Sequence, residues 1–239
     1  MNILNIETSG KICSVALTSD GVLELQLDDR EGMRHAVKVA PFAERCMADL
    51  KRKEQKLDAV AVSIGPGSYT GLRIGLSFAK GLAFSLGIPL IGVDTLKILA
   101  VKAMFRSFDW TGDEILVPMI DARRMEVFTA AYDFALNEVL TPRPLILDRN
   151  SFADLLSGGR QLYFMGDGAE KARDVIHSPN AHWIDGLLPQ AKDMMALSEK
   201  AFIESDFLDL AYSTPKYLKD YQTTTPKNKV LSPHNSSNL

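Results

Sequence analysis

Short apolar runs separated by polar turns open the chain. They lie at 3–7, 13–17 and 22–27, and the residues between the first two, 8–11, have the composition of a hairpin turn. The third run alternates apolar and polar residues, which is typical of a strand with one buried face. The pattern predicts a three-stranded antiparallel meander at the start of the chain.

Helical and extended patterns then alternate. Residues 34–52 carry apolar side chains at helical spacing, 59–64 form a β-branched run, and 70–86 form a second helical segment. A strand at 89–93 and a helix at 95–104 follow. This order of three strands and then helix, strand, helix, strand, helix predicts a mixed sheet with helices packed on it.

The second half of the chain partly repeats this organisation, without a visible sequence repeat. Strands are expected at 115–120, 126–132 and 162–165, with a further extended run after a turn near Asn137. Helices are expected at 151–156, 169–176 and 191–203. Since 239 residues can form two modest domains, we expect two α/β subdomains. Their expected bounds are 1–108 for the N-terminal subdomain and 109–221 for the C-terminal one, with a polar tail at 222–239.

The predicted helix at 70–86 is apolar around most of its circumference. Only Arg73, Ser77 and Lys80 form a polar stripe on it. A helix of this kind must be covered on more than one side. The sheet can cover one side, so the other requires a neighbouring helix or another protein.

A glycine-rich turn precedes this helix, and its sequence permits two interpretations. Gly65 and Gly67 flank Pro66, and Thr70 is a suitable N-cap for the helix. Such a turn can present backbone N–H groups to a phosphate, or it can only shape the chain. With Glu7 at the end of the first strand, and Asp167 in a second glycine turn, it forms the candidate nucleotide site. For Asp167 we favour a role as the cap of the following helix.

Composition and motifs narrow the chemistry. The net charge of −3 disfavours a protein that grips nucleic acid unaided, and Cys13 and Cys46 form neither a disulfide framework nor a CxxC site. No Walker A motif is present, and the four histidines lack metal-ligand spacing. We therefore expect no metal site. The N-terminus lacks the pattern of a signal peptide and no apolar run suits a membrane span, so we expect a cytoplasmic protein.

Several motifs together resemble one family. The segment GPGSYTGLRIG lies at 65–75, and the others are ILNIETS at 3–9, CSVAL at 13–17, DARRMEV at 121–127, GDGA at 166–169 and PKYLK at 215–219. In this order and over almost the whole chain, they are similar to the TsaB (YeaZ) family. Glu7 is a departure, because many relatives have aspartate there.

The resemblance implies an actin-like (ASKHA, ribonuclease H-like) fold of two related subdomains. It also implies a non-catalytic subunit that pairs with the transferase subunit TsaD in the synthesis of threonylcarbamoyladenosine in tRNA. A TsaE-like ATPase would be a further partner, tRNA would be met only through the complex, and a homodimer could use the same surface. No cofactor of its own is implied, whereas ATP and Mg²⁺ would act at the level of the complex.

In relatives the two long helices of the first subdomain form a bundle with the partner. The resemblance therefore implies the following interface residues: Ala36, Ala40, Ala43, Met47, Leu72, Arg73, Leu76, Ala79 and Lys80. We expect Leu72→Glu or Leu76→Glu to leave a folded protein that cannot pair.

Two other functions stay open at this point. An actin-like nucleotide-binding phosphotransferase would use Glu7, the glycine turns and Asp167. A metallopeptidase is less favoured, because the HxxxH metal motif carried by TsaD relatives does not occur in this chain.

Overall fold

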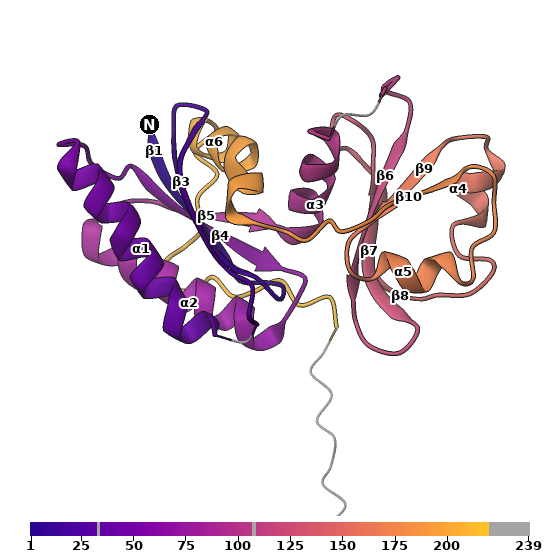
Figure 1. Cartoon of the computed structure of the whole chain (residues 1–239), viewed down its shortest axis with the longest axis horizontal. Helices are drawn as coiled ribbons and strands as arrows, with labels where there is room; N and C mark the ends of the chain where they lie inside the picture. The colour runs from indigo at the N-terminus through magenta and orange to yellow at the C-terminus, as the bar shows by residue number, and fades with distance from the viewer. Residues whose placement is uncertain (33, 107–108, 220–239) are drawn as a thin grey trace, which may run out of the picture.

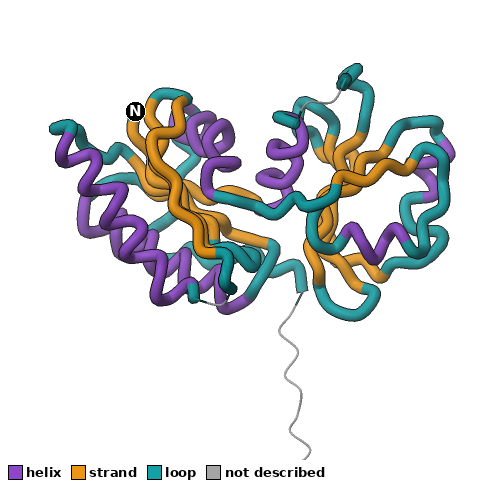
Figure 2. Tube along the Cα trace, viewed as in Figure 1, coloured by secondary structure: helices purple, strands orange, loops and turns teal. Residues whose placement is uncertain are grey.

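Two sheets of five strands lie side by side, each flanked by helices (Figure 1). The computed structural model describes residues 1–32, 34–106 and 109–219. Figure 2 shows the strands of each half gathered in the middle, with helices and loops on their outer faces. This arrangement confirms the predicted α/β fold of two subdomains.

The first sheet has the strand order β3-β2-β1-β4-β5. β1 pairs antiparallel with β2 and parallel with β4, which confirms the predicted meander and the mixed sheet. Its elements are β1 (Asn2–Glu7), β2 (Cys13–Ser19), β3 (Val22–Asp29), α1 (His35–Arg52), β4 (Ala59–Gly65), α2 (Tyr69–Leu86), β5 (Leu90–Asp94) and α3 (Thr95–Met104).

The second sheet has the order β10-β9-β6-β7-β8, so it repeats the strand order and the pairing directions of the first. β10 was not predicted, because its four residues carry too little pattern. The elements of this half are β6 (Ile115–Asp121), β7 (Glu126–Tyr132), β8 (Glu138–Ile146), α4 (Ala153–Ser157), β9 (Leu162–Met165), α5 (Ala169–Arg173) and β10 (Ala181–Ile184).

Alternation of side chains along the strands of the first sheet builds two cores. Leu4 and Ile6 face α1 and α2, whereas Ile3 and Ile91 face the opposite side. That opposite side is covered by residues from the end of the chain, the short helix η1 (Ala191–Met194) and α6 (Met195–Ile203).

This return of the chain differs from the expected bounds of the subdomains. Residues 191–219 were placed with the second sheet, but α6 packs against β1 and β5. In exchange, α3 follows the first sheet in sequence and packs chiefly on β6 of the second. The physical reason is that each sheet has two apolar faces, and the helices that follow its own strands cover only one of them. The expected tail, 222–239, lies outside the described residues.

The start of α2 differs slightly from the prediction. α2 begins at Tyr69, and the cap is the Ser68 side chain, which accepts a hydrogen bond from Gly71 N, in place of the expected Thr70. None of the helices in the described ranges is long and apolar enough to cross a membrane.

Candidate functional site

The glycine turn before α2 is filled by the protein's own backbone. Ser68 N donates a hydrogen bond to Ser9 O (2.7 Å) in the β1–β2 turn. A Cβ atom at Gly67 would lie 2.5 Å from Ser9 O, and one at Gly65, where φ is +111°, would lie 2.8 Å from Lys216 O. Both glycines are therefore required by close approach within the chain.

The first two turns of α2 press on the same β1–β2 turn. A Cβ atom at Gly71 would lie 2.1 Å from Thr8 O, and one at Gly75 would lie 2.1 Å from Thr8 Oγ1. Thr8 Oγ1 in turn donates to Gly71 O (2.9 Å). The glycines of the segment 65–75 thus work together as a packing motif that seats α2 on the end of β1.

Glu7 holds the β1–β2 turn on which α2 packs. Its side chain is completely buried, and Oε1 accepts hydrogen bonds from the backbone N and the hydroxyl of Ser9. Burial raises the pKa of Glu7 to about 7, against these hydrogen bonds, which lower it. Oε2 has no hydrogen-bond partner among the described residues. Glu7 therefore holds the β1–β2 turn in the position that fills Gly67.

Asp167 lies in the turn after β9 of the second sheet, whereas the other three candidates belong to the first half. Asp167 was expected to cap α5, but this prediction is wrong, because no side chain caps α5. Its Oδ1 instead accepts a hydrogen bond from Asp121 N (3.0 Å), which ties the turn after β9 to the end of β6. A Cβ atom at Gly166 would lie 2.1 Å from Met119 O, so this second glycine turn is also closed by the chain itself.

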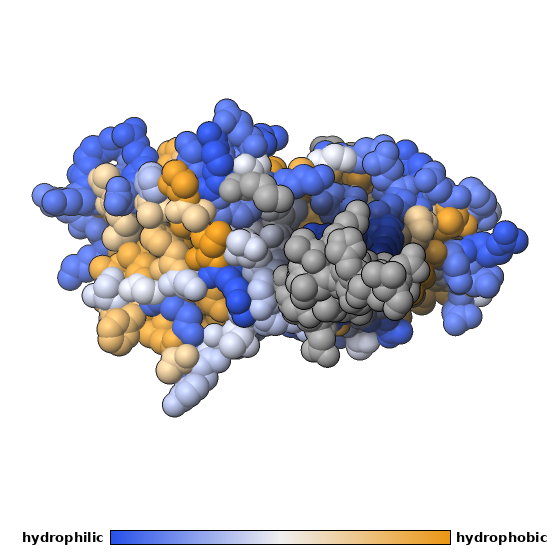
Figure 3. All heavy atoms as spheres, turned by 90° about the horizontal axis from the view of Figure 1, so that it is seen from below, coloured by the Kyte–Doolittle hydropathy of each residue, from blue (hydrophilic) through white to orange (hydrophobic). Residues whose placement is uncertain are grey.

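The outer face of α1 and α2 is apolar and uncovered. The exposed fractions are 67% for Val37 and 78% for Phe84, and Ile74 and Phe78 are half-buried. A Cβ atom at Gly81 would meet nothing within 4 Å. Figure 3 shows apolar surface gathered on the left, where Figure 1 places these two helices. We call this surface, formed by the exposed sides of α1 and α2, the docking face.

Four of the expected interface residues lie in the core instead. Ala43, Leu72, Leu76 and Ala79 are buried, and all but Leu72 belong to the cluster between the sheet and the two helices. They cannot contact a partner while the protein is folded. The expectation that Leu72→Glu or Leu76→Glu leaves a folded chain is corrected for the same reason, because either change would place a carboxylate at a buried position.

The polar stripe of α2 contacts the chain's own C-terminal segment, 205–219, which we call the strap. Arg73 Nε donates to Tyr217 Oη (3.1 Å), and Lys80 Nζ donates to the carbonyl oxygens of Ala211 and Ser213 (3.2 and 3.0 Å). Arg73 and Lys80 thus bind the strap, a role for which the sequence gives no signal. Ala36 is exposed while Ala40 and Met47 are half-buried, and a contact of these three with a partner stays a prediction.

The residues that form the docking face had a partial signal in the sequence. Ile74 and Phe78 extend the apolar surface of the helix beyond what the sheet can cover. Gly81 interrupts that surface, at some cost in helix propensity. Val37 and Phe84 carry no signal of their own, because spacing alone does not separate a core side chain from an exposed one.

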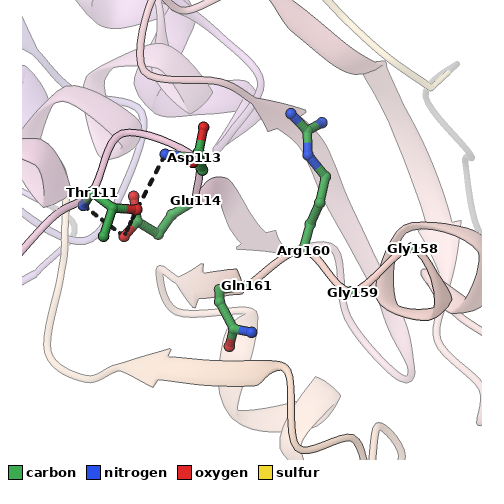
Figure 4. Close-up of a pocket in the computed structure, with 7 residues that line it drawn as sticks. All are labelled: Thr111, Asp113, Glu114, Gly158, Gly159, Arg160 and Gln161. Carbon is green, nitrogen blue, oxygen red and sulfur yellow. Dashed lines mark hydrogen bonds between the residues drawn. The ribbon is translucent and has the colours of Figure 1, made fainter.

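A separate cavity of about 290 Å³ lies in the second subdomain (Figure 4). The carboxylate of Glu114, which lines this cavity, accepts hydrogen bonds from Thr111 N, Thr111 Oγ1 and Gly112 N. These bonds stabilise the loop that precedes β6. Figure 4 shows Arg160 extended away from Gln161, so the lining groups do not converge. In the described part of the chain, no group of three or more His, Cys, Asp or Glu residues could hold a metal ion.

Comparison with known proteins places this architecture. The family model described as "TsaD: tRNA N6-adenosine threonylcarbamoyltransferase" matches residues 31–236. The tRNA threonylcarbamoyladenosine biosynthesis protein TsaB of Escherichia coli (strain K12) is 31% identical over 92% of this chain and 95% of its own length. The TsaB protein of Bacillus subtilis (strain 168) is 32% identical over 74% of this chain and 75% of its own length.

Solved structures agree with the sequence relatives. YeaZ from Pseudomonas aeruginosa has a TM-score of 0.75 and 27% identity, covering 91% of this chain and 99% of that one. An inorganic polyphosphate/ATP-glucomannokinase from Arthrobacter sp. strain KM, at 10% identity and a TM-score of 0.50, covers 85% of this chain and 99% of that one and shares the fold alone. These likenesses confirm the expected actin-like fold. With matches over most of its length in both sequence and structure, the chain belongs to the TsaB (YeaZ) family.

Proposed function

We propose that this protein is a non-catalytic docking subunit of the complex that makes threonylcarbamoyladenosine in tRNA, where it supports a TsaD-related transferase subunit. The observation that carries the proposal is the contrast within the segment 65–86. The backbone of the protein itself fills the space beside Gly65, Gly67 and Gly71, whereas the helix that follows leaves an apolar face open.

The chemistry of the docking face fits a helical protein partner. Contiguous exposed apolar surface on a folded protein is typical of an interaction site. Gly81 permits close approach of a partner backbone, and Val37 and Phe84 offer side chains that can enter a groove. The same face on a second copy would allow a homodimer when the transferase subunit is absent.

The remaining members of the system follow from family membership and are part of the proposal. A TsaE-like ATPase joins the complex, ATP and Mg²⁺ act there, and tRNA is met through the assembled complex in the cytoplasm. We expect this chain to need no cofactor for docking, because the glycines of the segment 65–75 serve packing.

Pairing can be tested by light scattering and calorimetry with the TsaD-like subunit. We expect Phe84→Glu combined with Val37→Glu to weaken pairing at least about ten-fold, because the pair would place two charges in an apolar contact. The matched control is Ile146→Glu on β8, where the native side chain is 71% exposed but lies in the other subdomain. Equal affinity of the double variant and the wild type would contradict the proposal.

Reconstitution tests the role in modification. We expect tRNA modification by the TsaD-like subunit to require this chain and to fall with the double variant, whereas the chain alone modifies no tRNA. Activity of the chain alone, or full activity of the complex without it, would contradict a supporting subunit.

The competing function is an actin-like nucleotide-binding phosphotransferase. The observation in its favour is Oε2 of buried Glu7 at the end of β1, which has no hydrogen-bond partner in the part of the chain that the structure describes. The contacts that fill Gly65 and Gly67 favour docking instead. Calorimetry with ATP and Mg²⁺ distinguishes the two, because tight binding that is lost in Glu7→Gln would support the phosphotransferase.

A further inference from the structure

The strap begins directly after α6 and follows the edge of the first sheet. Leu208 N donates a hydrogen bond to Leu90 O (2.8 Å) on β5, and the Leu208 and Leu210 side chains pack against the first core. Figure 1 shows this yellow segment passing below the first sheet to the junction of the two halves. The strap is thus an extended segment held by separate anchors.

Its second set of anchors lies on α2, beside the docking face. The rings of Tyr217 and Tyr69 stack with their centroids 4.8 Å apart, and the Arg73 guanidinium lies 4.2 Å from the centroid of the Tyr69 ring. With the hydrogen bonds from Arg73 and Lys80, these contacts fix the strap along the polar stripe of the helix. Any force that displaces α2 will therefore also displace the strap.

The last anchors connect the strap to the strand ends and to the second sheet. Lys216 N donates to Ile64 O (2.7 Å), and Lys216 Nζ pairs with Asp94 (3.0 Å). Three residues later, Lys219 Nζ pairs with Glu126 on β7 (2.7 Å). Within the described residues the strap therefore runs from the docking helix to the second subdomain.

Another connection between the subdomains lies where α3 contacts η1 and the residue before it. There Lys102 Nζ, which is largely buried, binds Asp193 (2.8 Å) and Gln190 (2.7 Å). α3 also packs on β4 and β5 of the first sheet and on β6 of the second, so it joins the two halves at this place. Two connections at separate places restrict rotation between the sheets more than one does, and the strap supplies the other one.

We propose that the strap couples the docking helix to the angle between the two subdomains. A partner bound to α2 stabilises the strap anchors, and the strap in turn holds β7 through Lys219 and Glu126. We call the connection of the strap to β7 through Lys219 and Glu126 the tie. The tie is present in the free chain, whereas its response to a partner rests on the proposed function.

The tie is tested by pulsed dipolar spectroscopy on the full chain, with spin labels on cysteines introduced at Gln55 and Glu138. Both positions are exposed, one after α1 and one on β8, while Cys13 and Cys46 are buried. We expect a narrow distance distribution in the otherwise unchanged chain and a broader one in Lys219→Glu. The charge swap Lys219→Glu with Glu126→Lys should restore the narrow distribution, because it restores the ion pair.

The control is Lys200→Glu, which changes an exposed lysine of α6 that pairs with Glu204 of its own helix. Equal widths for Lys219→Glu and the control would overturn the tie. So would a charge swap that stays as broad as the single variant.

The coupling is tested by adding the TsaD-like subunit. We expect the partner to narrow the distribution in the chain with native anchors but not in Tyr217→Ala, which still binds it. Equal narrowing in both would overturn the coupling. Failure of the chain with native anchors to bind would instead overturn the proposed function and the partner response, while the free-chain comparison still decides the tie.

Discussion

The two halves of the molecule share one strand order but use their helices differently. In the first half, α1 and α2 have 18 residues each, whereas the corresponding α4 and α5 of the second half have five each. Both halves retain a glycine turn after the fourth strand of the sheet, and in both the turn is filled by backbone of the same chain. The difference teaches that the same sheet can serve as a scaffold for different surfaces, because in the first half it carries two long helices with an exposed apolar side.

The ends of the corresponding strands β1 and β6 also differ. Glu7 is buried, and burial raises its pKa to about 7. Partial burial would raise the pKa of Asp121 too, but hydrogen bonds from Lys171 and from Arg123 N outweigh it and lower the pKa. The first strand end is thus part of the core, and the second faces water.

The largest expected effect comes from adding one methyl group at the tight glycines of either half. Gly71→Ala and Gly166→Ala each place a Cβ atom 2.1 Å from a carbonyl oxygen of the chain. We expect each to lower the free energy of unfolding by about 3 kcal/mol or more, as overpacking against backbone does. Denaturant titration measures the change, and a loss confined to one half would break the equivalence of the two turns.

The next effect is a pH dependence that belongs to the first strand end. Between about pH 4.5 and 7 the unfolded chain loses the Glu7 proton while the folded chain keeps it, so stability falls as pH rises through this window and levels off above it. We expect this decrease to reach at most about 3 kcal/mol and to be absent in Glu7→Gln. Denaturant titration at several pH values checks the slope.

Asp121→Asn is the matched control at the second strand end. Its pKa is lowered, so the stability that its charge contributes is lost only as pH falls through the acid range, in the opposite direction to Glu7. A slope between pH 5 and 7 that disappears in Asp121→Asn, and persists in Glu7→Gln, would contradict the assignment.

The smallest effect has the opposite sign and sharpens the contrast within α2. A Cβ atom at Gly81 meets nothing, so Gly81→Ala should raise the free energy of unfolding by up to about 1 kcal/mol through helix propensity. Pairing with the TsaD-like subunit should weaken at the same time, because the glycine leaves room for a partner. A stabilised variant with unchanged pairing would remove Gly81 from the docking face.

Sequence patterns predicted the first sheet well and the use of α2 poorly, for a physical reason. Short strands and their order follow from local alternation and turn residues, which act over a few positions. The helical spacing of Leu72 and Leu76 marks an apolar face, but it does not tell whether the sheet or a partner covers that face. The candidate Glu7 was found from its place at the end of β1, and its burial depends on packing that no local pattern carries.

The partners of Arg73 and Lys80 could not be predicted, since they lie more than a hundred residues away in a segment without periodicity. For the same reason the return of α6 to the first sheet was missed. Long-range choices of this kind are decided by which apolar face remains uncovered after local elements form, and that is a property of the assembled sheets.

The crossing of α6 onto the first sheet decides how the chain can be cut. A fragment ending at residue 108 would keep every strand of the first sheet, yet it would expose the face that carries Ile3 and Ile91 to water. Such a fragment should aggregate when produced alone and become soluble when residues 191–219 are supplied as a separate peptide. We therefore expect the first sheet and residues 191–219 to fold as one unit, so any split reporter or domain transplant built from this sheet must carry both segments.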